Sequence, residues 1–235
     1  MKFLSATIAC LFILLTTGCA TVPQAKVTLN NTFFQQTDKV VGLYVSNLPK
    51  NPDTHLYGAS CLLCYAVAST ANSSLTKHIK TVSTDDLAIL EKELTQSLKN
   101  EGINVKVIKD KLNIDELKKF SNKDGFHARK DYRSLKEKLN VDKLIVINFK
   151  NVGVFRSYSA YVPTSDPMGF VSGELYSVDL VTNRYDLYEP INIKVAVKGS
   201  WDEAPNFPGV TTAFFEALEL SKSNIMHIFK ANQGS

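Results

Sequence analysis

The residues from 144 onward limit the fold more than any other part of this sequence. Residues 144–149 form a short, almost continuous apolar run, typical of a strand in a sheet that is covered on both faces. The helical period then disappears. Three longer segments, separated by turns, have the pattern of antiparallel strands: 152–162, 170–181 and 185–197. The C-terminal half therefore predicts a buried strand that leads into an antiparallel meander.

The rest of the chain alternates strands with helices. In chain order we expect a strand at 39–46, a leucine-striped helix that begins near Ser83 and ends before Gly102, a strand at 103–108, short helices around 114–120 and 132–139, and a last helix at 211–230. Alternation followed by a meander predicts an α/β (α+β) fold. It would have a mixed sheet with helices packed on its faces, a C-terminal antiparallel meander and a final long helix.

Composition and charge exclude several classes of protein. The 235 residues are 44% hydrophobic and 21% charged, which is ordinary for a globular chain and argues against disorder or a coiled coil. The net charge of only +4 argues against a dedicated nucleic-acid binder. Residues 118–133 hold a basic run that Asp124 and Asp131 dilute. Such a run is typical of a solvated face, or of a contact with anionic lipid headgroups or peptidoglycan.

The first twenty residues resemble an export signal. Lys2 precedes an apolar run at 3–15 that suits a signal-peptide core and is too short to span a bilayer. The run ends in Leu15-Thr16-Thr17-Gly18-Cys19, which resembles the lipobox of bacterial lipoproteins, although Thr16 stands where that family usually has leucine. The alternatives are a plain secretory signal or a buried N-terminal helix.

The lipobox resemblance implies how the chain is processed and where it is found. In that family the cysteine is acylated with diacylglycerol and becomes the first mature residue, which makes Cys19 the expected lipidation site. The resemblance implies a signal peptide at 1–18, a lipidated N-terminus and tether at 19–38, and a single periplasmic domain at 39–230. Ala20 follows the cysteine, whereas an aspartate there favours retention in the inner membrane. An outer-membrane protein anchored on the periplasmic side is therefore expected.

Two further resemblances bear on architecture and location. The hairpin sequence at 176–184 and the element order resemble TolB N-terminal domains and curli-secretion (CsgG-like) domains of the periplasm. Residues 58–64 (GASCLLC) and 71–76 (ANSSLT) resemble motifs of an uncharacterised family of proteobacterial lipoproteins. These resemblances imply a place in the cell envelope and no particular activity.

The segment 56–76 contains no charged residue and carries the pair Cys61 and Cys64. We interpret the segment as a buried small-residue helix or an ordered loop, or alternatively as a subunit-interface or membrane-dipping segment. In an oxidising compartment the two cysteines would form a structural disulfide or remain as buried thiols, and a redox-active pair is the alternative. A zinc site lacks further ligands at suitable spacing.

No motif for catalysis, metal binding or a cofactor is found, so the sequence predicts a binding or assembly protein without its own chemistry. Aromatic residues in two loops form the expected interaction surface: Tyr158, Tyr161, Trp201 and Phe207. The alternative is that these rings pack on the sheet ends and close the core. Expected partners are the membrane, through the anchor, and an envelope protein or a second copy of the chain.

Overall fold

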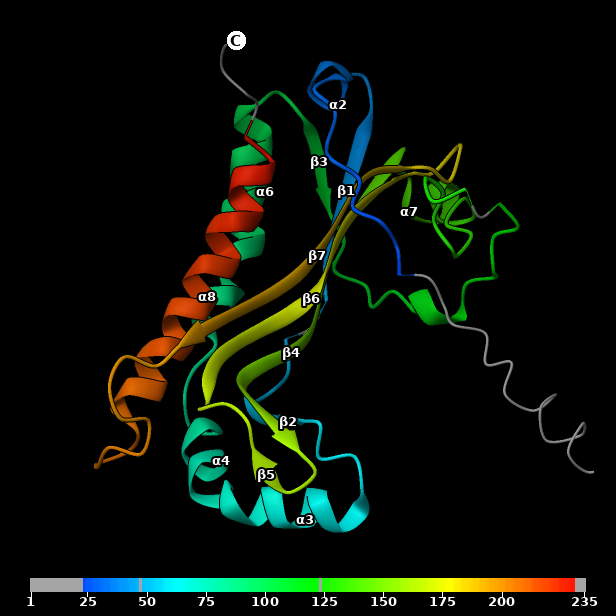
Figure 1. The fold of residues 1–235 in the computed structure, drawn as a ribbon. Helices are drawn as coiled ribbons and strands as arrows, with labels where there is room; N and C mark the ends of the chain where they lie inside the picture. Colours follow the sequence, from blue (N-terminus) through cyan, green and yellow to red (C-terminus); the bar gives the residue numbers. More distant parts are fainter. Residues whose placement is uncertain (1–22, 47, 123, 231–235) are drawn as a thin grey trace, which may run out of the picture.

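The computed structural model describes residues 23–46, 48–122 and 124–230, and its centre is one mixed sheet (Figure 1). The main strands are β1 (Val40–Val45), β3 (Asn104–Val107), β4 (Lys143–Ser159), β6 (Met168–Asp179) and β7 (Tyr185–Ala196). They lie in the order β3-β1-β4-β6-β7, with β1 parallel to β3 and β4, and β4, β6 and β7 antiparallel. This arrangement confirms the predicted mixed sheet and antiparallel meander.

Strand β4 runs through the region where two strands were predicted. A β-bulge between Phe149 and Asn151 shifts the register, so the chain bends without leaving the sheet. Beyond the bulge, β4 pairs with β2 (Asp53–Tyr57), a parallel strand that the sequence analysis missed because two prolines precede it. At its far end, β4 turns back into the short strand β5 (Val162–Pro163).

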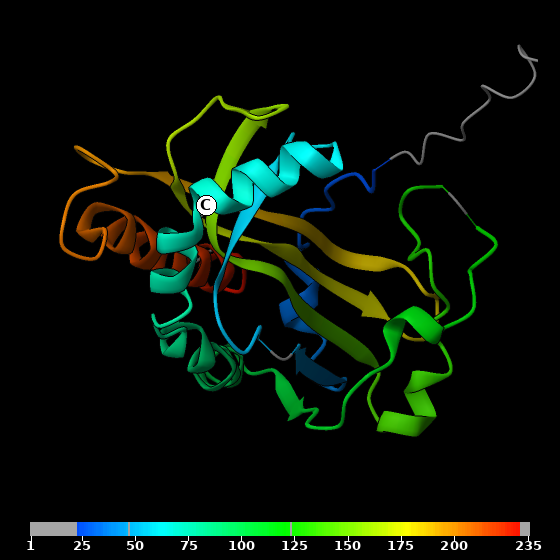
Figure 2. The same cartoon turned by 90° about the horizontal axis from the view of Figure 1, so that it is seen from below.

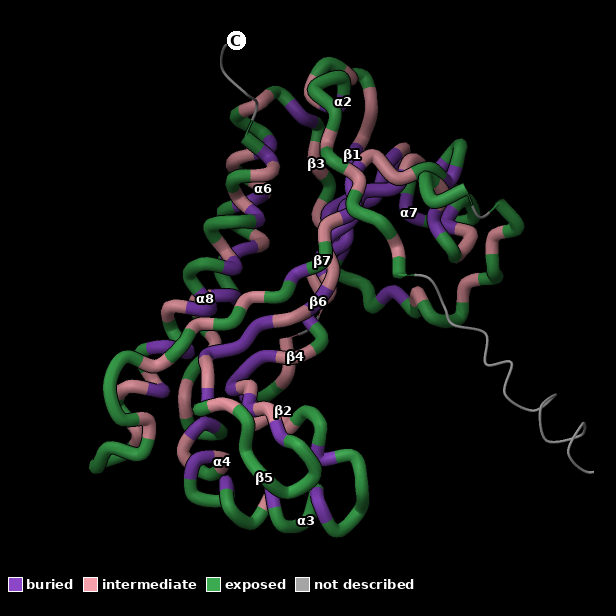
Figure 3. Tube along the Cα trace, in the orientation of Figure 1, coloured by how far each residue is buried: buried purple, intermediate pink, exposed green. Residues whose placement is uncertain are grey.

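Two helices cover one face of the sheet. α6 (Leu90–Asn100) and α8 (Pro208–Ile228) pack their apolar sides on inward-facing strand residues, and α5 (Asp85–Ala88) precedes α6. Leucines at positions 87, 90, 94 and 98 are almost fully buried, as their helical spacing predicts. The single helix expected there is divided at Ile89. Figure 3 shows the buried positions concentrated between these helices and the strands. The final long helix and the α+β class are confirmed.

Among the described residues, those that cover the opposite face lie near one end of the sheet. There α7 (Leu135–Leu139) and the 3₁₀ helix η2 (Ile114–Glu116) form a second core with Tyr44, Tyr132 and Tyr176. The helix predicted around 114–120 is only this single turn, because Leu117 and Phe120 are parts of an irregular loop that is tied to other segments. The predicted helix at 132–139 is shortened to α7.

The domain begins before residue 39. Val27 forms an antiparallel bridge with Tyr188 of β7, and the short helix α2 (Thr32–Gln35) buries Phe33 against the core. Residues 27–38 are therefore held on the domain, and any tether to Cys19 is shorter than the expected stretch 19–38. The predicted signal peptide and lipidation site, residues 1–18 and Cys19, lie outside the described residues. Among the helices that the structure describes, none combines the length and apolar character needed to cross a bilayer.

A candidate docking site: the apolar tip

One end of the molecule, opposite α7 along β4, is built from α3 (Leu62–Ala71), α4 (Ser73–Ile79) and the β4–β5 turn (Figures 1 and 2). In the described part of the chain, twelve large hydrophobic side chains are exposed, and seven of them lie at this end. We call these seven the apolar tip: Tyr57, Leu62, Leu63, Tyr65, Val67, Tyr161 and Val162. A concentration of exposed apolar side chains at one end of a domain is typical of a site of protein or membrane contact.

α3 lies on the surface because only one narrow side of it is needed for packing. Cys64 and Ala68 are buried, one turn apart, against Ala59 and Tyr158. The remaining positions of α3 carry apolar or small uncharged residues and face outward, as the exposed trace in Figure 3 shows. A helix that is apolar on all sides is normally covered. The interpretation of 56–76 as a mainly buried helix is therefore wrong for α3, and an interface or membrane-contacting role remains open.

A disulfide between Cys61 and Cys64 closes the first turn of α3. Cys61 is the N-cap residue, and its sulfur accepts a hydrogen bond from the backbone N–H of Cys64 at 2.9 Å. Cys61 is exposed and Cys64 is buried, so the bridge fastens the helix start to the domain. Leu62 and Leu63, 90% and 69% exposed, lie inside this closed turn. The two most exposed hydrophobic residues of the tip are thus held on a rigid turn.

A buried polar network fixes the α3–α4 junction to β4 and to the loop between β5 and β6. The amide of Asn72, at the junction of the helices, donates to the Tyr158 hydroxyl at 2.6 Å and to the Ala68 carbonyl at 2.7 Å. Arg156 of β4 donates to the Asn72 side-chain oxygen at 2.9 Å and to the Ser165 carbonyl at 3.2 Å. Its guanidinium also lies 4.5 Å from the ring centroid of Trp201. One buried cation therefore joins three segments behind the tip.

The four aromatic residues expected to form one interaction surface are separated by the fold. Tyr158 is buried in the Asn72 network, and of the four only Tyr161 is exposed, at the tip. Trp201 and Phe207 are half-buried, stacked with centroids 6.3 Å apart, and packed over the core around Val210. Three of the four rings therefore close the core. The sequence analysis missed Leu62 and Leu63 as surface residues, although the charge-free segment around them was the available signal.

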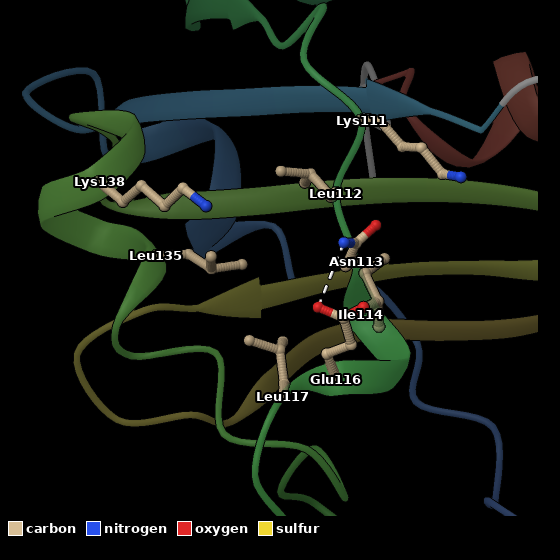
Figure 4. A pocket seen from close by; sticks show the side chains of 8 residues that line it. All are labelled: Lys111, Leu112, Asn113, Ile114, Glu116, Leu117, Leu135 and Lys138. Atoms are coloured by element: carbon tan, nitrogen blue, oxygen red, sulfur yellow. Dashed lines mark hydrogen bonds between the residues drawn. The ribbon is translucent and has the colours of Figure 1, made fainter.

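Cavities offer no equally clear site. The pocket in Figure 4, of about 280 Å³, is lined by apolar side chains such as Leu112 and Leu135 with Lys111 and Lys138 at its rim. A larger groove, of about 910 Å³, lies beside the second core and is lined by Tyr44, Tyr176, Tyr185 and other tyrosines. Burial raises the pKa of Tyr185 to about 12, so its phenol stays neutral. Within the described residues, no group of His, Cys, Asp and Glu is arranged to hold a metal ion.

Comparison with known proteins adds no relative: no family model matches the chain, and no curated protein gives a significant match.

Proposed function

We propose that this chain is a lipid-anchored accessory protein of the bacterial cell envelope that binds a partner protein through the apolar tip and performs no catalysis. The observation that carries the proposal is the clustering of exposed hydrophobic side chains on an uncharged surface helix. The N-terminal sequence ending in Cys19 supports the anchor and the location at the outer membrane, on the periplasmic side. The partner is an envelope protein, or a second copy of the chain, that presents an uncharged apolar face.

The composition of the tip favours a protein partner over a lipid surface. The centre of a protein interface is depleted of charged residues and enriched in tyrosine, with polar groups around it. The tip has three exposed tyrosines, and the exposed Asp166 lies in the loop that follows β5. Interfacial membrane helices instead carry lysine and arginine on their polar face. α3 carries neither.

Placing negatively charged side chains in the apolar tip tests the proposal. We expect Leu62→Asp/Leu63→Asp to weaken partner binding by about 100-fold, because two desolvated leucines are lost and two carboxylates would be buried unpaired. Stability should change by less than about 1 kcal/mol, since both side chains are exposed in the free protein. Co-purification of the anchored chain from crosslinked envelopes measures binding, and urea unfolding measures stability. Leu220→Asp, an exposed leucine of α8, is the matched control. Equal losses in both variants would refute a specific tip.

A thiol–disulfide role is the second candidate, and the placement of the bridge favours it. Cys61 is exposed at the start of a helix, where the dipole stabilises a thiolate. We nevertheless expect a structural bridge. Cys61→Ser/Cys64→Ser should lower stability by about 2 kcal/mol and weaken partner binding several-fold, because Leu62 and Leu63 lose their fixed turn. Insulin reduction by the reduced wild-type chain, at a rate near that of a dithiol oxidoreductase, would favour redox catalysis instead.

The anchor has its own test. We expect Cys19→Ala to abolish acylation and to release the chain from the membrane fraction, because the acyl chains supply the bilayer affinity. Metabolic labelling with palmitate and flotation of membranes measure the two effects, with Cys10→Ala as the control. A Cys19→Ala chain that still floats and still incorporates palmitate would contradict the anchor.

A further inference from the structure

The net positive charge of the chain is concentrated in one segment. Residues 118–133 contain six lysines and arginines and two aspartates, so their net charge is 6 − 2 = +4, equal to the net charge of all 235 residues. We call 118–133 the basic loop, and its described residues, 118–122 and 124–133, form the candidate surface. Lys118, Lys119 and Arg133 are exposed, and so is Phe126, at 53%. Outside this loop the charges of the chain cancel, which makes it a distinct electrostatic surface.

The basic loop is fixed to the end of the sheet opposite the tip. Asn183, in the β6–β7 turn with φ of 62°, donates through its amide to the carbonyls of Ala128 and Lys130 and accepts from the backbone of Tyr132. His127 forms a bridge with Arg184, whose guanidinium lies 5.6 Å from the Phe126 ring centroid. The exposed basic and aromatic side chains are therefore held together on an ordered scaffold, and Arg184 adds a further cation.

The chain reaches the domain at this same loop. Gln24 donates its side-chain amide to the Gly125 carbonyl at 2.5 Å, so the second described residue already touches the basic loop. Cys19 lies only four positions before Pro23, and four residues span at most about 14 Å. If Cys19 carries the lipid, the basic loop is held close to the bilayer surface. The apolar tip lies at the other end of β4, whose seventeen residues extend over about 50 Å.

We propose that the basic loop, together with Arg184, binds the headgroups of anionic phospholipids in the bilayer that holds the anchor, with Phe126 inserted among them. This inference rests on the proposed lipid anchor. Each lysine or arginine near an anionic surface contributes about 1 kcal/mol, and this attraction weakens with salt. Charge complementarity and the short connection to Cys19 both favour a lipid surface here. The loop would set the orientation of the domain and direct the apolar tip away from the membrane.

The experiment places a fluorescent reporter on the loop of the acylated full-length chain. Phe126→Trp is inserted into phosphatidylcholine vesicles with or without 30% phosphatidylglycerol, both containing brominated phosphatidylcholine as a quencher. Phe215→Trp, an exposed phenylalanine of α8, is the matched control, and Trp201 contributes the same background to both. We expect at least twofold quenching of the residue 126 reporter in the anionic vesicles only. The quenching of the residue 126 reporter should decrease in 0.5 M salt. It should also decrease when the chain carries Lys118→Gln and Lys119→Gln in addition.

Flotation of the same samples separates the two proposals. A chain that floats with both kinds of vesicle but shows no quenching at residue 126 retains the anchor and overturns the basic-loop contact. Equal quenching at residues 126 and 215, or equal quenching in neutral and anionic vesicles, also overturns it. A chain that fails to float refutes the anchor and, with it, this inference. Preferential binding of the loop to peptidoglycan sacculi, with no quenching on vesicles, would overturn the lipid contact and show that the basic loop binds peptidoglycan instead.

Discussion

Replacing Arg156 by methionine is expected to lower the free energy of unfolding by about 3 kcal/mol. The guanidinium is buried and donates to both Asn72 and the Ser165 carbonyl, so methionine would leave a buried acceptor on Asn72 and a partly buried one on Ser165 unpaired. Contact with the Trp201 ring would also be lost. Because the same cation joins the α3–α4 junction to the loop between β5 and β6, we also expect weaker partner binding, although Arg156 lies behind the tip and would not touch the partner.

A second cation on the same sheet provides the control for Arg156. Lys194 of β7 lies 3.6 Å from the ring centroid of Phe155, but its side chain is exposed to solvent. Lys194→Met should therefore cost less than about 1 kcal/mol and leave partner binding unchanged. Chemical unfolding and partner capture on both variants test the contrast. Similar losses for the two would mean that the Arg156 network does not position the tip.

Replacing Gly169 by alanine is expected to cost about 3 kcal/mol or more, among the largest effects of any single methyl group added to this chain. A Cβ atom on Gly169 would lie 1.9 Å from the Ala213 carbonyl oxygen and 2.3 Å from its carbon. Both atoms belong to the backbone of α8, so no side-chain rotation relieves the clash. α8 would have to move away from β6, which exposes the core around Phe214.

Gly125→Ala separates steric overlap from the general cost of replacing glycine. Nothing lies within 4 Å of a Cβ at Gly125, but its φ of +84° is unfavourable for alanine. We expect a cost of about 1 kcal/mol at that position. Thermal unfolding of both variants measures the difference. If Gly169→Ala were no more destabilising than Gly125→Ala, the tight packing of α8 on β6 would be wrong.

The fold was largely predictable because its strongest signals are local. The apolar run at 144–149, the alternation that follows it and the leucine stripe of α6 each reflect the burial of one element against the sheet. β2 was missed because its residues are only half-buried and it is stabilised by pairing with a distant part of β4. The bulge that keeps β4 continuous depends equally on tertiary contacts, which a sequence pattern does not contain.

The site was predictable only in part. The absence of charge in 56–76 indicated an unusual segment, but burial and exposure of an apolar helix give the same sequence pattern. Only the packing shows that α3 contacts the domain through Cys64 and Ala68, so that Leu62 and Leu63 remain exposed to solvent. Tyr158 and Trp201 were expected at an interface because aromatic residues in loops favour it. Instead both rings pack beside Arg156, and the Trp201 contact joins positions far apart in the chain.

Site-specific photocrosslinking in living envelopes tests the central claim most directly. A photoreactive amino acid replaces Leu63 in the membrane-anchored full chain, and Leu220 in a control chain. The account predicts a protein adduct at position 63 that disappears when Leu62 is also changed to aspartate, and no comparable adduct at position 220. An adduct with lipid alone at position 63, or equal protein adducts at both positions, would contradict a docking role for the apolar tip.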